Sequence, residues 1–460
     1  MKPGTNTVVV QKNIPVAYEV DVAVVGGGPA GVAAAVAAAR EGIRVLLIEQ
    51  TNCLGGIATA GWHGHICMYC SQSELAKDRI VGGFCYEITQ DIVREGYGSY
   101  DNWALDFEVE RLKYILEKKV SALENLRVLY YTQFVDVLAE DGRIETVIIQ
   151  NKSGLQAVKA GIVIDCTGDG DVATRAGAEY EMGRPGDGAI QPMTLMFQIG
   201  GVDYPRYDRF WREEYPKRYG AFEWGHSSLW RDLQEKGLME PFQNHTCGIW
   251  WTPTRPDQVG VNFTHIFAKD PTDAEDLTYA TMEGRRQAYE TVEIFRRFLP
   301  GFENSWLSHT AQLIGTRESR RILGDYFITT NDLYAHKQFE DSIGYGSFFF
   351  DVHNCTDIGM DQETEQPPEG FRYQIPYRAL IPRTLKNVLV AGRCISCDHH
   401  ALGSLRVMPQ CFIEGDAAGT AAAIALMDGT SIRKIGIAKL QNTLRAHGSI
   451  VAEEDIVTIS

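Results

Sequence analysis

Residues 22–56 read VAVVGGGPAGVAAAVAAAREGIRVLLIEQTNCLGG, and they place Gly26, Gly28 and Gly31 in the spacing G-x-G-x-x-G. The glycines follow an apolar, β-branched run that is typical of a buried parallel strand. A run of small residues with good helix propensity comes next, and a second apolar run ends at Glu49. The stretch therefore predicts a strand–helix–strand unit of the kind that binds a dinucleotide.

Each residue of this motif has a separate physical task. Gly26 allows the tight turn, Gly28 lets the backbone approach a pyrophosphate, and Gly31 lets the helix pack closely on the strand. Free N–H groups at the start of the helix would face the anion. Glu49, about 20 residues beyond the motif, would accept hydrogen bonds from ribose hydroxyls. The alternative is a tight turn of the same shape that holds no ligand.

Length and charge limit the possible functions. The chain has 460 residues, enough for two or three domains, and its net charge of −16 argues against nucleic-acid binding by charge attraction. No apolar run reaches the roughly 18–20 residues of a membrane span. The first residues, MKPGTNTVVVQKNIP, lack the apolar region of a secretory leader. We therefore expect a cytoplasmic protein with reduced cysteines.

The rest of the chain alternates between strand-like and loop-rich stretches. Residues 51–105 show little periodicity and predict a loop-rich segment, whereas residues 107–123 have apolar residues at helical spacing. Strand patterns separated by turns at Asp141-Gly142 and Ser153-Gly154 follow, and the last strand leads into the Gly- and Asp-rich loop 167–171. In an open α/β sheet, ligands bind beyond the carboxyl ends of the strands.

Aromatic residues mark a different region further along. Five of the eight tryptophans fall within 41 positions, and they predict a separate α+β cap domain. The apolar run at 387–392 then returns to the sheet, and a helix is expected from about Val407. We expect an α/β fold with a discontinuous Rossmann-like domain and an inserted cap, divided as 1–195 (first part), 196–370 (cap), 371–430 (C-terminal part) and 431–460 (helical tail).

Several motifs together resemble one family. They are GGGPAG with Glu49, CLGGIATAG, CTGDGDVA, ESRRILGDY, IPYRALIP, NVLVAGRCIS, ALGSLRVMP and GDAAGTAAA. This set is similar to the FAD-dependent oxidoreductases of the glutathione-reductase-like, two-dinucleotide-binding-domain superfamily, near fumarate reductase flavoproteins and heterodisulfide reductase flavin subunits. The resemblance spans about residues 18–450 and implies bound FAD, but it implies no substrate.

The resemblance also assigns the cofactor site, with Arg406 facing the pyrimidine edge of the flavin and no metal expected. The residues that it implies for FAD are Gly26, Gly28, Pro29, Ala30, Gly31, Glu49, Gln50, Gly55, Gly56, Thr167, Gly168, Asp169, Gly392, Arg393, Val407 and Met408.

The candidates for catalysis are histidines and arginines. His399 is the expected acid or base, with His400 beside it, and His63 and His65 are close enough to the double-glycine loop to reach the flavin. Each histidine has a structural alternative as a brace, and covalent attachment of FAD to a histidine is a further alternative. Arg320 lies in an arginine cluster around Glu318 that either clamps a substrate carboxylate or fixes the cap through internal salt bridges.

Two C-x-x-C pairs complete the candidates, Cys67 with Cys70 and Cys394 with Cys397. They permit a metal or cluster, a redox dithiol, or plain reduced cysteines. A second G-x-G-x-x-G after a strand is missing, which argues against a nicotinamide-binding domain that could recharge a dithiol. We therefore expect none of these cysteines to be essential for redox turnover, and Cys397 is the one serious candidate for such a role.

The sequence thus predicts hydride transfer between a small organic substrate and flavin N5, with oxygen, a quinone or a partner protein as electron acceptor or donor. The alternatives are a flavin-linked thiol–disulfide oxidoreductase and an electron-transfer subunit that docks to an iron–sulfur protein. The sequence does not predict the oligomeric state.

Overall fold

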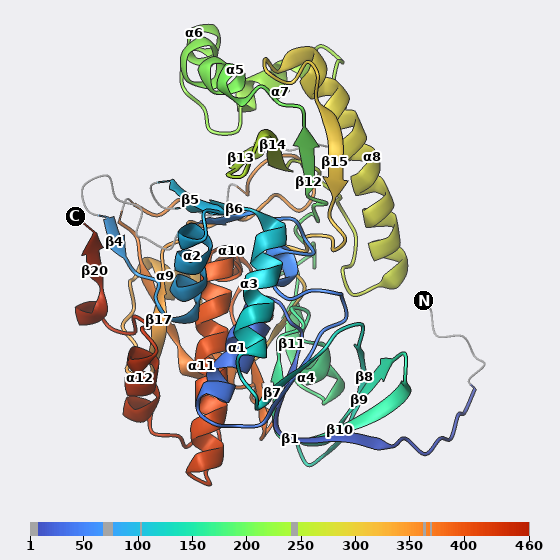
Figure 1. The fold of residues 1–460 in the computed structure, drawn as a ribbon, viewed down its shortest axis with the longest axis vertical. Helices are drawn as coiled ribbons and strands as arrows, with labels where there is room; N and C mark the ends of the chain where they lie inside the picture. The colour runs from blue at the N-terminus through green and yellow to red at the C-terminus, as the bar shows by residue number, and fades with distance from the viewer. Residues whose placement is uncertain are drawn as a thin grey trace.

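The computed structural model describes residues 8–67, 77–101, 104–240, 247–361, 365–368 and 370–459. Its main sheet runs in the order β7-β2-β1-β10-β9-β8, and β19 also pairs with β10 (Figure 1). The pairs β7-β2, β2-β1, β1-β10 and β10-β19 are parallel, and β10-β9 and β9-β8 are antiparallel. The strands are β1 (Val16–Val25), β2 (Val45–Ile48), β7 (Leu126–Leu129), β8 (Gln133–Glu140), β9 (Arg143–Asn151), β10 (Gly154–Asp165) and β19 (Val388–Val390).

Burial along the strands explains the parallel core of this sheet. All four residues of β2 and the last four of β1 are buried, as expected when both faces of a parallel sheet are covered. The predicted turn at Asp141-Gly142 is confirmed: both residues have positive φ, the conformation of a tight β-hairpin turn. The predicted α/β class with a Rossmann-like sheet is therefore confirmed.

Two helices pack unusually closely beside the sheet. In Figure 1, α1 (Pro29–Arg40) and α11 (Met408–Met427) run side by side through the centre of the molecule. A Cβ atom added at Gly415 would lie 2.0 Å from the carbonyl oxygen of Ala30, and one at Gly419 would lie 2.1 Å from that of Ala34. Only glycine permits this approach, which brings the N-termini of both helices to the same region.

Shorter elements surround this core. The segment 51–105 contains a helix that we did not expect, α2 (Gly83–Arg94), whose buried face includes Phe84, Ile88 and Ile92 at intervals of four. The other helices of this part are α3 (Val109–Ser121), α4 (Asp171–Arg175), α9 (Thr330–Tyr334), α10 (His399–Leu405) and α12 (Ile437–Ala446). The small sheets pair β3 (His65–Cys67) with β6 (Ala104–Phe107), β6 with β5 (Gly98–Asp101), β11 (Tyr180–Met182) with β16 (Arg320–Ile322), β17 (Ser342–Gly346) with β18 (Tyr373–Pro376), and β4 (Lys77–Arg79) with β20 (Val457–Ile459).

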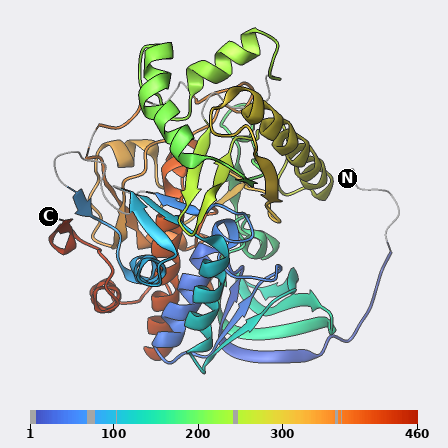
Figure 2. The ribbon, with the colours of Figure 1, turned by 45° about the horizontal axis from the view of Figure 1, so that its top comes forward.

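A second sheet and several helices form a layer above the main sheet and its helices, in green and yellow in Figure 2. Its strand order is β13-β14-β12-β15, all antiparallel. The stretch from about residue 316, which the predicted division assigns to the cap, instead pairs with β11 and packs on α11. The elements of the layer are β12 (Phe197–Gly200), α5 (Tyr204–Arg209), α6 (Tyr215–Tyr219), α7 (Ser227–Glu235), β13 (Gly248–Thr252), β14 (Arg255–Asn262), α8 (Ala274–Phe298) and β15 (Trp306–Thr310).

Among the residues that the structure describes, no helix combines the length and apolar character needed to cross a bilayer.

Candidate functional site

A cavity of about 1360 Å³ lies between the carboxyl ends of the parallel strands and the cap layer. Most ligand pockets have volumes of roughly 300–1,000 Å³, so this cavity has room for a large cofactor and a small substrate together. The predicted residues that line it are Gly26, Gly28, Pro29, Ala30, Glu49, Gln50, Gly56, His63, Thr167, Gly168, Asp169, Gly392, Arg393, Arg406, Val407 and Met408.

The first glycine loop has the geometry that a dinucleotide requires. Gly26 has a φ of 98°, and a Cβ there would lie 2.3 Å from the carbonyl oxygen of Cys166. A Cβ on Gly31 would meet the carbonyl of Gly26, so Gly31 serves packing and does not line the cavity. At Gly28 an added Cβ would meet no atom within 4 Å. The space in front of Gly28 is thus part of the cavity, where a pyrophosphate could approach the backbone.

Glu49 stands at the end of β2, as the motif predicts. Its Oε2 accepts a hydrogen bond from the N–H of Gly27 and its Oε1 accepts one from Thr51, both at 2.7 Å. A carboxylate has about four acceptor positions, so further hydrogen bonds from ribose hydroxyls are possible on its cavity side. The double-glycine loop is held beside the first glycine loop by the N–H of Gly55, which donates a hydrogen bond to the carbonyl oxygen of Gly27 at 2.8 Å. Gly55 itself does not line the cavity.

The second loop, residues 167–169, is held by charged side chains from distant segments. Arg393 Nη1 donates to the carboxylate of Asp169 at 2.8 Å, and Arg320 Nε donates to the carbonyl oxygen of Asp169 at 2.7 Å. Arg320 also pairs with Asp171 and does not line the cavity. Of the two roles that the sequence left open for the arginine cluster, the structure therefore favours the structural one for Arg320, as a brace behind the loop.

The N-termini of α1 and α11 both open onto the cavity. Their N-cap residues, Gly28 and Val407, form no side-chain cap hydrogen bond, so backbone N–H groups remain for a ligand. Two helix ends with positive partial charge favour a phosphate or another anion at this position. Together with the open space at Gly28 and the acceptor at Glu49, the chain fits FAD.

The structure does not bring His399 to the cavity. Its side chain is 1% exposed, and its Nδ1 lies 2.8 Å from Oε1 of Glu318, the oxygen that also pairs with Arg321. The ring braces a buried ion cluster behind the site, because Glu318 and Arg321 are themselves buried. His399 is therefore not placed as the acid or base we predicted, and His400 beside it lies 3.8 Å from Asp361.

A different polar group lines the cavity, and the sequence reasoning missed most of it. Nη2 of Arg406 donates to the backbone oxygen of Asp351 at 2.6 Å and lies 3.1 Å from its carboxylate. Asp351 is 3.2 Å from Nε2 of His353, whose Nδ1 lies 3.1 Å from Nε2 of His265. Burial opposes ionisation of Asp351, but His353 and Arg406 hold its pKa below the usual range. Burial, followed by the charge of Arg317, lowers the pKa of His353 to about 4.

Arg317 completes this group. It belongs to the arginine cluster noted in the sequence, yet unlike Arg320 and Arg321 it reaches the cavity wall. Its Nη1 donates to the carbonyl oxygen of Pro192 at 2.7 Å and to Oγ1 of Thr194 at 2.6 Å. Burial, with a smaller effect of Arg406, lowers its pKa to about 9, so the guanidinium remains charged at neutral pH.

His63 is the predicted catalytic histidine that does line the cavity. Burial, followed by the charges of His65 and Arg317, lowers its pKa to about 3. The edge of Trp250 contacts its ring, with 5.1 Å between centroids. The imidazole is therefore neutral near pH 7.

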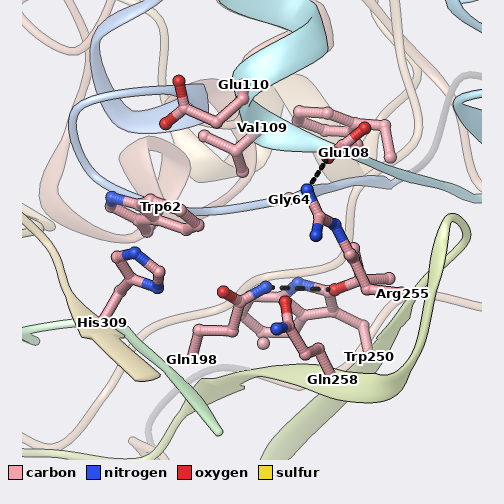
Figure 3. Close-up of a pocket in the computed structure, with 13 residues that line it drawn as sticks. Trp62, Gly64, Glu108, Val109, Glu110, Gln198, Trp250, Arg255, Gln258 and His309 are labelled. Atoms are coloured by element: carbon pink, nitrogen blue, oxygen red, sulfur yellow. Dashed lines mark hydrogen bonds and ion pairs between the residues drawn. The ribbon is translucent and has the colours of Figure 1, made fainter. Parts of the chain in front are cut away.

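Trp250 also separates the large cavity from a smaller pocket of about 250 Å³. Figure 3 shows this pocket between Trp62, whose ring stacks on His309 at 4.7 Å, and the strands that carry Gln198 and Arg255. Arg255 pairs with Glu108 at 3.4 Å across its rim.

The C-terminal C-x-x-C pair is not placed for exchange with a substrate. Cys394 and Cys397 are both 0% exposed, and burial raises the pKa of each thiol well above its ordinary value. Cys70 of the other pair lies outside the described residues. Among the residues that the structure does describe, no cluster of His, Cys, Asp and Glu is arranged to hold a metal ion.

Comparison with known proteins agrees with this geometry. The sequence profile of the family described as FAD dependent oxidoreductase matches residues 21–444. Thiamine thiazole synthase of Aeropyrum pernix is 31% identical over 175 residues, which are 35% of this chain and 59% of that protein, so the match spans about three-fifths of its length.

Solved structures are similar over most of the chain at low identity. A geranylgeranyl bacteriochlorophyll reductase-like protein of Thermoplasma acidophilum has 12% identity and a TM-score of 0.47, over 94% of this chain and 82% of that one. The p-nitrophenol 4-monooxygenase of Pseudomonas putida has 12% identity and a TM-score of 0.44, over 94% and 88% of the two chains.

Proposed function

Because the chain belongs to the FAD-dependent oxidoreductase family, we propose that it moves a hydride between a small organic acid and bound FAD. FAD, when bound, supplies the hydride acceptor or donor, and the protein supplies binding, orientation and proton transfer. The observation that carries the proposal is Arg317, a charged side chain in the cavity wall that forms no ion pair with a carboxylate of the described residues, although the charge of Asp351 acts on it from a distance. A closer placement beside fumarate reductase flavoproteins stays a prediction.

Arg317 is a buried cation that a bound anion would stabilise. Its side chain is 6% exposed, and in the part of the chain that the structure describes no carboxylate forms an ion pair with it. Asp351 is already engaged by Arg406 and His353. Buried charges in proteins are normally paired, because desolvation of an isolated ion is costly. A carboxylate on the substrate supplies the missing charge, and a guanidinium binds carboxylates with two parallel hydrogen bonds.

In this proposal His63 is the residue that accepts the proton from the substrate. A substrate that gives up a hydride from carbon also loses a proton, from oxygen or nitrogen in a hydroxy acid or amino acid and from the adjacent carbon in a saturated dicarboxylate. The neutral imidazole of His63 in the cavity wall would accept this proton. Asp351, His353 and His265 line the same cavity and contact one another in that order. His63 and Arg317 are close enough for their charges to interact, so the base and the anion site serve one substrate.

The test is anaerobic bleaching of the flavin absorbance by a panel of 2-hydroxy acids, 2-amino acids and saturated dicarboxylates, each compared with its uncharged amide. We expect acids and not amides to reduce the flavin. Arg317→Gln should lower kcat/KM for the best acid by about 10²–10³-fold, the usual cost of leaving a buried charge without its partner. Arg317→Lys should recover part of this loss.

The matched control is Arg255→Gln, which removes an arginine from the rim of the neighbouring pocket and should leave the rate unchanged. Equal bleaching by acids and amides, or full activity of Arg317→Gln, would contradict the proposal that Arg317 binds a carboxylate of the substrate. Failure of every compound to reduce or reoxidise the flavin would contradict hydride transfer itself.

A further inference from the structure

Cys67, His65 and Asp106 line the same cavity, and the ring of His65 lies 6.3 Å from that of His63. They come from two neighbouring strands: His65 of β3 is the register partner of Asp106 in β6, and Cys67 follows two residues later. Residues two apart in a strand face the same side, so the sulfur and the imidazole are neighbours. Nδ1 of His65 lies 2.5 Å from Oδ1 of Asp106, and the Cys67 side chain is hydrogen-bonded to the same ring.

The His65 ring is positively charged in this arrangement. Burial disfavours the charge, but the hydrogen bonds with Asp106 and Cys67 outweigh burial and raise the pKa of His65 to about 10. The ring of Trp250 stacks against it at 6.0 Å, with an interplanar angle of 29°, and fixes its orientation. An imidazolium that is hydrogen-bonded to a cysteine stabilises the thiolate, which is the nucleophilic form of the side chain.

The surroundings of Cys67 differ from those of the other described cysteines. Cys67 is partly exposed, whereas the others are buried, and burial raises the pKa of each of their thiols. Cys397, the strongest candidate from the sequence, is among the buried ones. A thiol in contact with a cation and open to a ligand cavity is typical of reactive cysteines.

We propose that Cys67 is a second reactive group of this cavity, a nucleophile that adds to carbonyl compounds with His65 as proton donor and Asp106 as the residue that positions His65. The choice of a carbonyl rests on the proposed function, because oxidation of a hydroxy acid or amino acid at its C–H bond yields a carbonyl or an imine.

The addition is redox-neutral and needs no further reactant. The thiolate sulfur forms a bond to the carbonyl carbon, and the π electron pair moves to oxygen. That oxygen takes the proton from the ring nitrogen of His65 that does not face Asp106. The result is a neutral imidazole and a thiohemiacetal from an aldehyde, or a thiohemiketal from a ketone. Reversal restores the starting groups, so the site holds a carbonyl compound without consuming it.

The test is alkylation by iodoacetamide at pH 6.5 of the FAD-loaded protein, with the labelled peptide quantified by mass spectrometry in a Cys70→Ser background. An ordinary cysteine is about 1% thiolate at this pH. A neighbouring cation favours the thiolate, the form that reacts with iodoacetamide. We therefore expect Cys67 to react about tenfold faster than it does in His65→Asn, and faster than in Asp106→Asn. Excess butanal should slow the labelling of Cys67.

The control is Cys397→Ser, which should leave the labelling of Cys67 unchanged, and retention of FAD shows that each variant is folded. Equal alkylation rates of Cys67 in folded His65→Asn and in the parent protein would overturn the proposal that His65 activates this thiol. If butanal does not slow the labelling of Cys67, the proposal that this cysteine adds to carbonyl compounds is overturned. These readouts do not need a flavin substrate, so they fail or succeed independently of the bleaching assay.

Discussion

His63 and His399 have surroundings that give them different chemistry. His63 lines the cavity and has a lowered pKa, whereas His399 is buried against Glu318 on the far side of the arginine cluster. Substitution of His63 by Gln should lower turnover by about 10²–10⁴-fold with FAD retained, the usual effect of losing a general base. His399→Gln, which keeps a hydrogen-bonding group near Glu318, should change turnover far less. Stopped-flow flavin reduction separates the two.

The pH profile checks the same assignment. A base works only when neutral, so a histidine of ordinary pKa would lose activity below about pH 6.5. With a pKa of about 3, His63 should keep kcat/KM level down to about pH 4. Because this pKa lies below that of the unfolded chain, stability falls as pH drops from about 6.5, so circular dichroism must show a folded protein at each pH. A fall in kcat/KM below about pH 6.5, while the protein stays folded, would contradict the role of His63 as the base.

Single side chains were predictable only where a motif fixes the backbone. Gly26, Gly28 and Glu49 follow from local spacing, and the structure places all three at the cavity. The arginines around Glu318 could not be separated in this way. Arg317 and Arg320 are three residues apart, yet one faces the cavity and the other braces Asp169, because the chain turns into β16 between them. Likewise His265 and His353 carry no local signal, since only the cap layer brings them together.

The approach of α1 and α11 controls the site at the scale of elements. Both helices begin at the cavity wall, and their separation depends on Gly415 and Gly419. Gly419→Ala would place a methyl group 2.1 Å from the carbonyl oxygen of Ala34, so the helices must move apart. We expect a loss of about 1–3 kcal/mol in the free energy of unfolding, typical of overpacking. Urea denaturation followed by circular dichroism measures it.

Flavin content should fall in the same variant, because the two helix N-termini no longer converge on one anion. The comparison is Gly96→Ala at the exposed end of α2, where an added Cβ meets no atom within 4 Å and the positive φ alone adds strain. If Gly419→Ala is as stable as Gly96→Ala and binds as much FAD, the contact between α1 and α11 does not determine the geometry of the FAD site.

Elements with strong periodicity and clear end signals can be predicted from the sequence, whereas α2, which lacks a start signal, could not be. Its apolar residues Phe84, Ile88 and Ile92 repeat at helical spacing, but the helix follows Gly82 and has no side-chain cap. Without a start signal, and between stretches rich in glycine and aromatics, the local sequence predicts a loop. Packing on α3 and α11 stabilises this helix, and such long-range contacts are not visible in the local sequence.

On the scale of the whole molecule, the cofactor site joins parts of the chain that are far apart in sequence. The first loop and Glu49 come from the first 50 residues, the second loop from residues 167–169, and the α11 end from residues 406–408. A ligand that contacts all of these parts stabilises the folded state as a unit, because binding to the native form alone shifts the unfolding equilibrium.

Removal of FAD should therefore lower the thermal midpoint of the entire chain, including the cap. At FAD concentrations about a thousandfold above Kd, the stabilisation is about 4 kcal/mol. Gly28→Val should reproduce the cofactor-free state. The backbone at Gly28 has φ −68° and ψ −173°, which valine adopts without strain, but its side chain would occupy the open space in front of the loop. We expect a folded, colourless protein whose midpoint does not respond to added FAD.

Gly436→Val provides a matched control for this experiment. Gly436 is also the N-cap of a helix, α12, with φ −70°, and a Cβ there would lie 3.7 Å from its nearest neighbour, in ordinary contact. Both variants lose an N-cap glycine, so any cost to helix capping is shared, and only Gly28→Val should lose the cofactor. Differential scanning fluorimetry with and without FAD, together with the flavin absorbance, measures both effects. Stoichiometric FAD in Gly28→Val would show that the pyrophosphate does not bind at this loop.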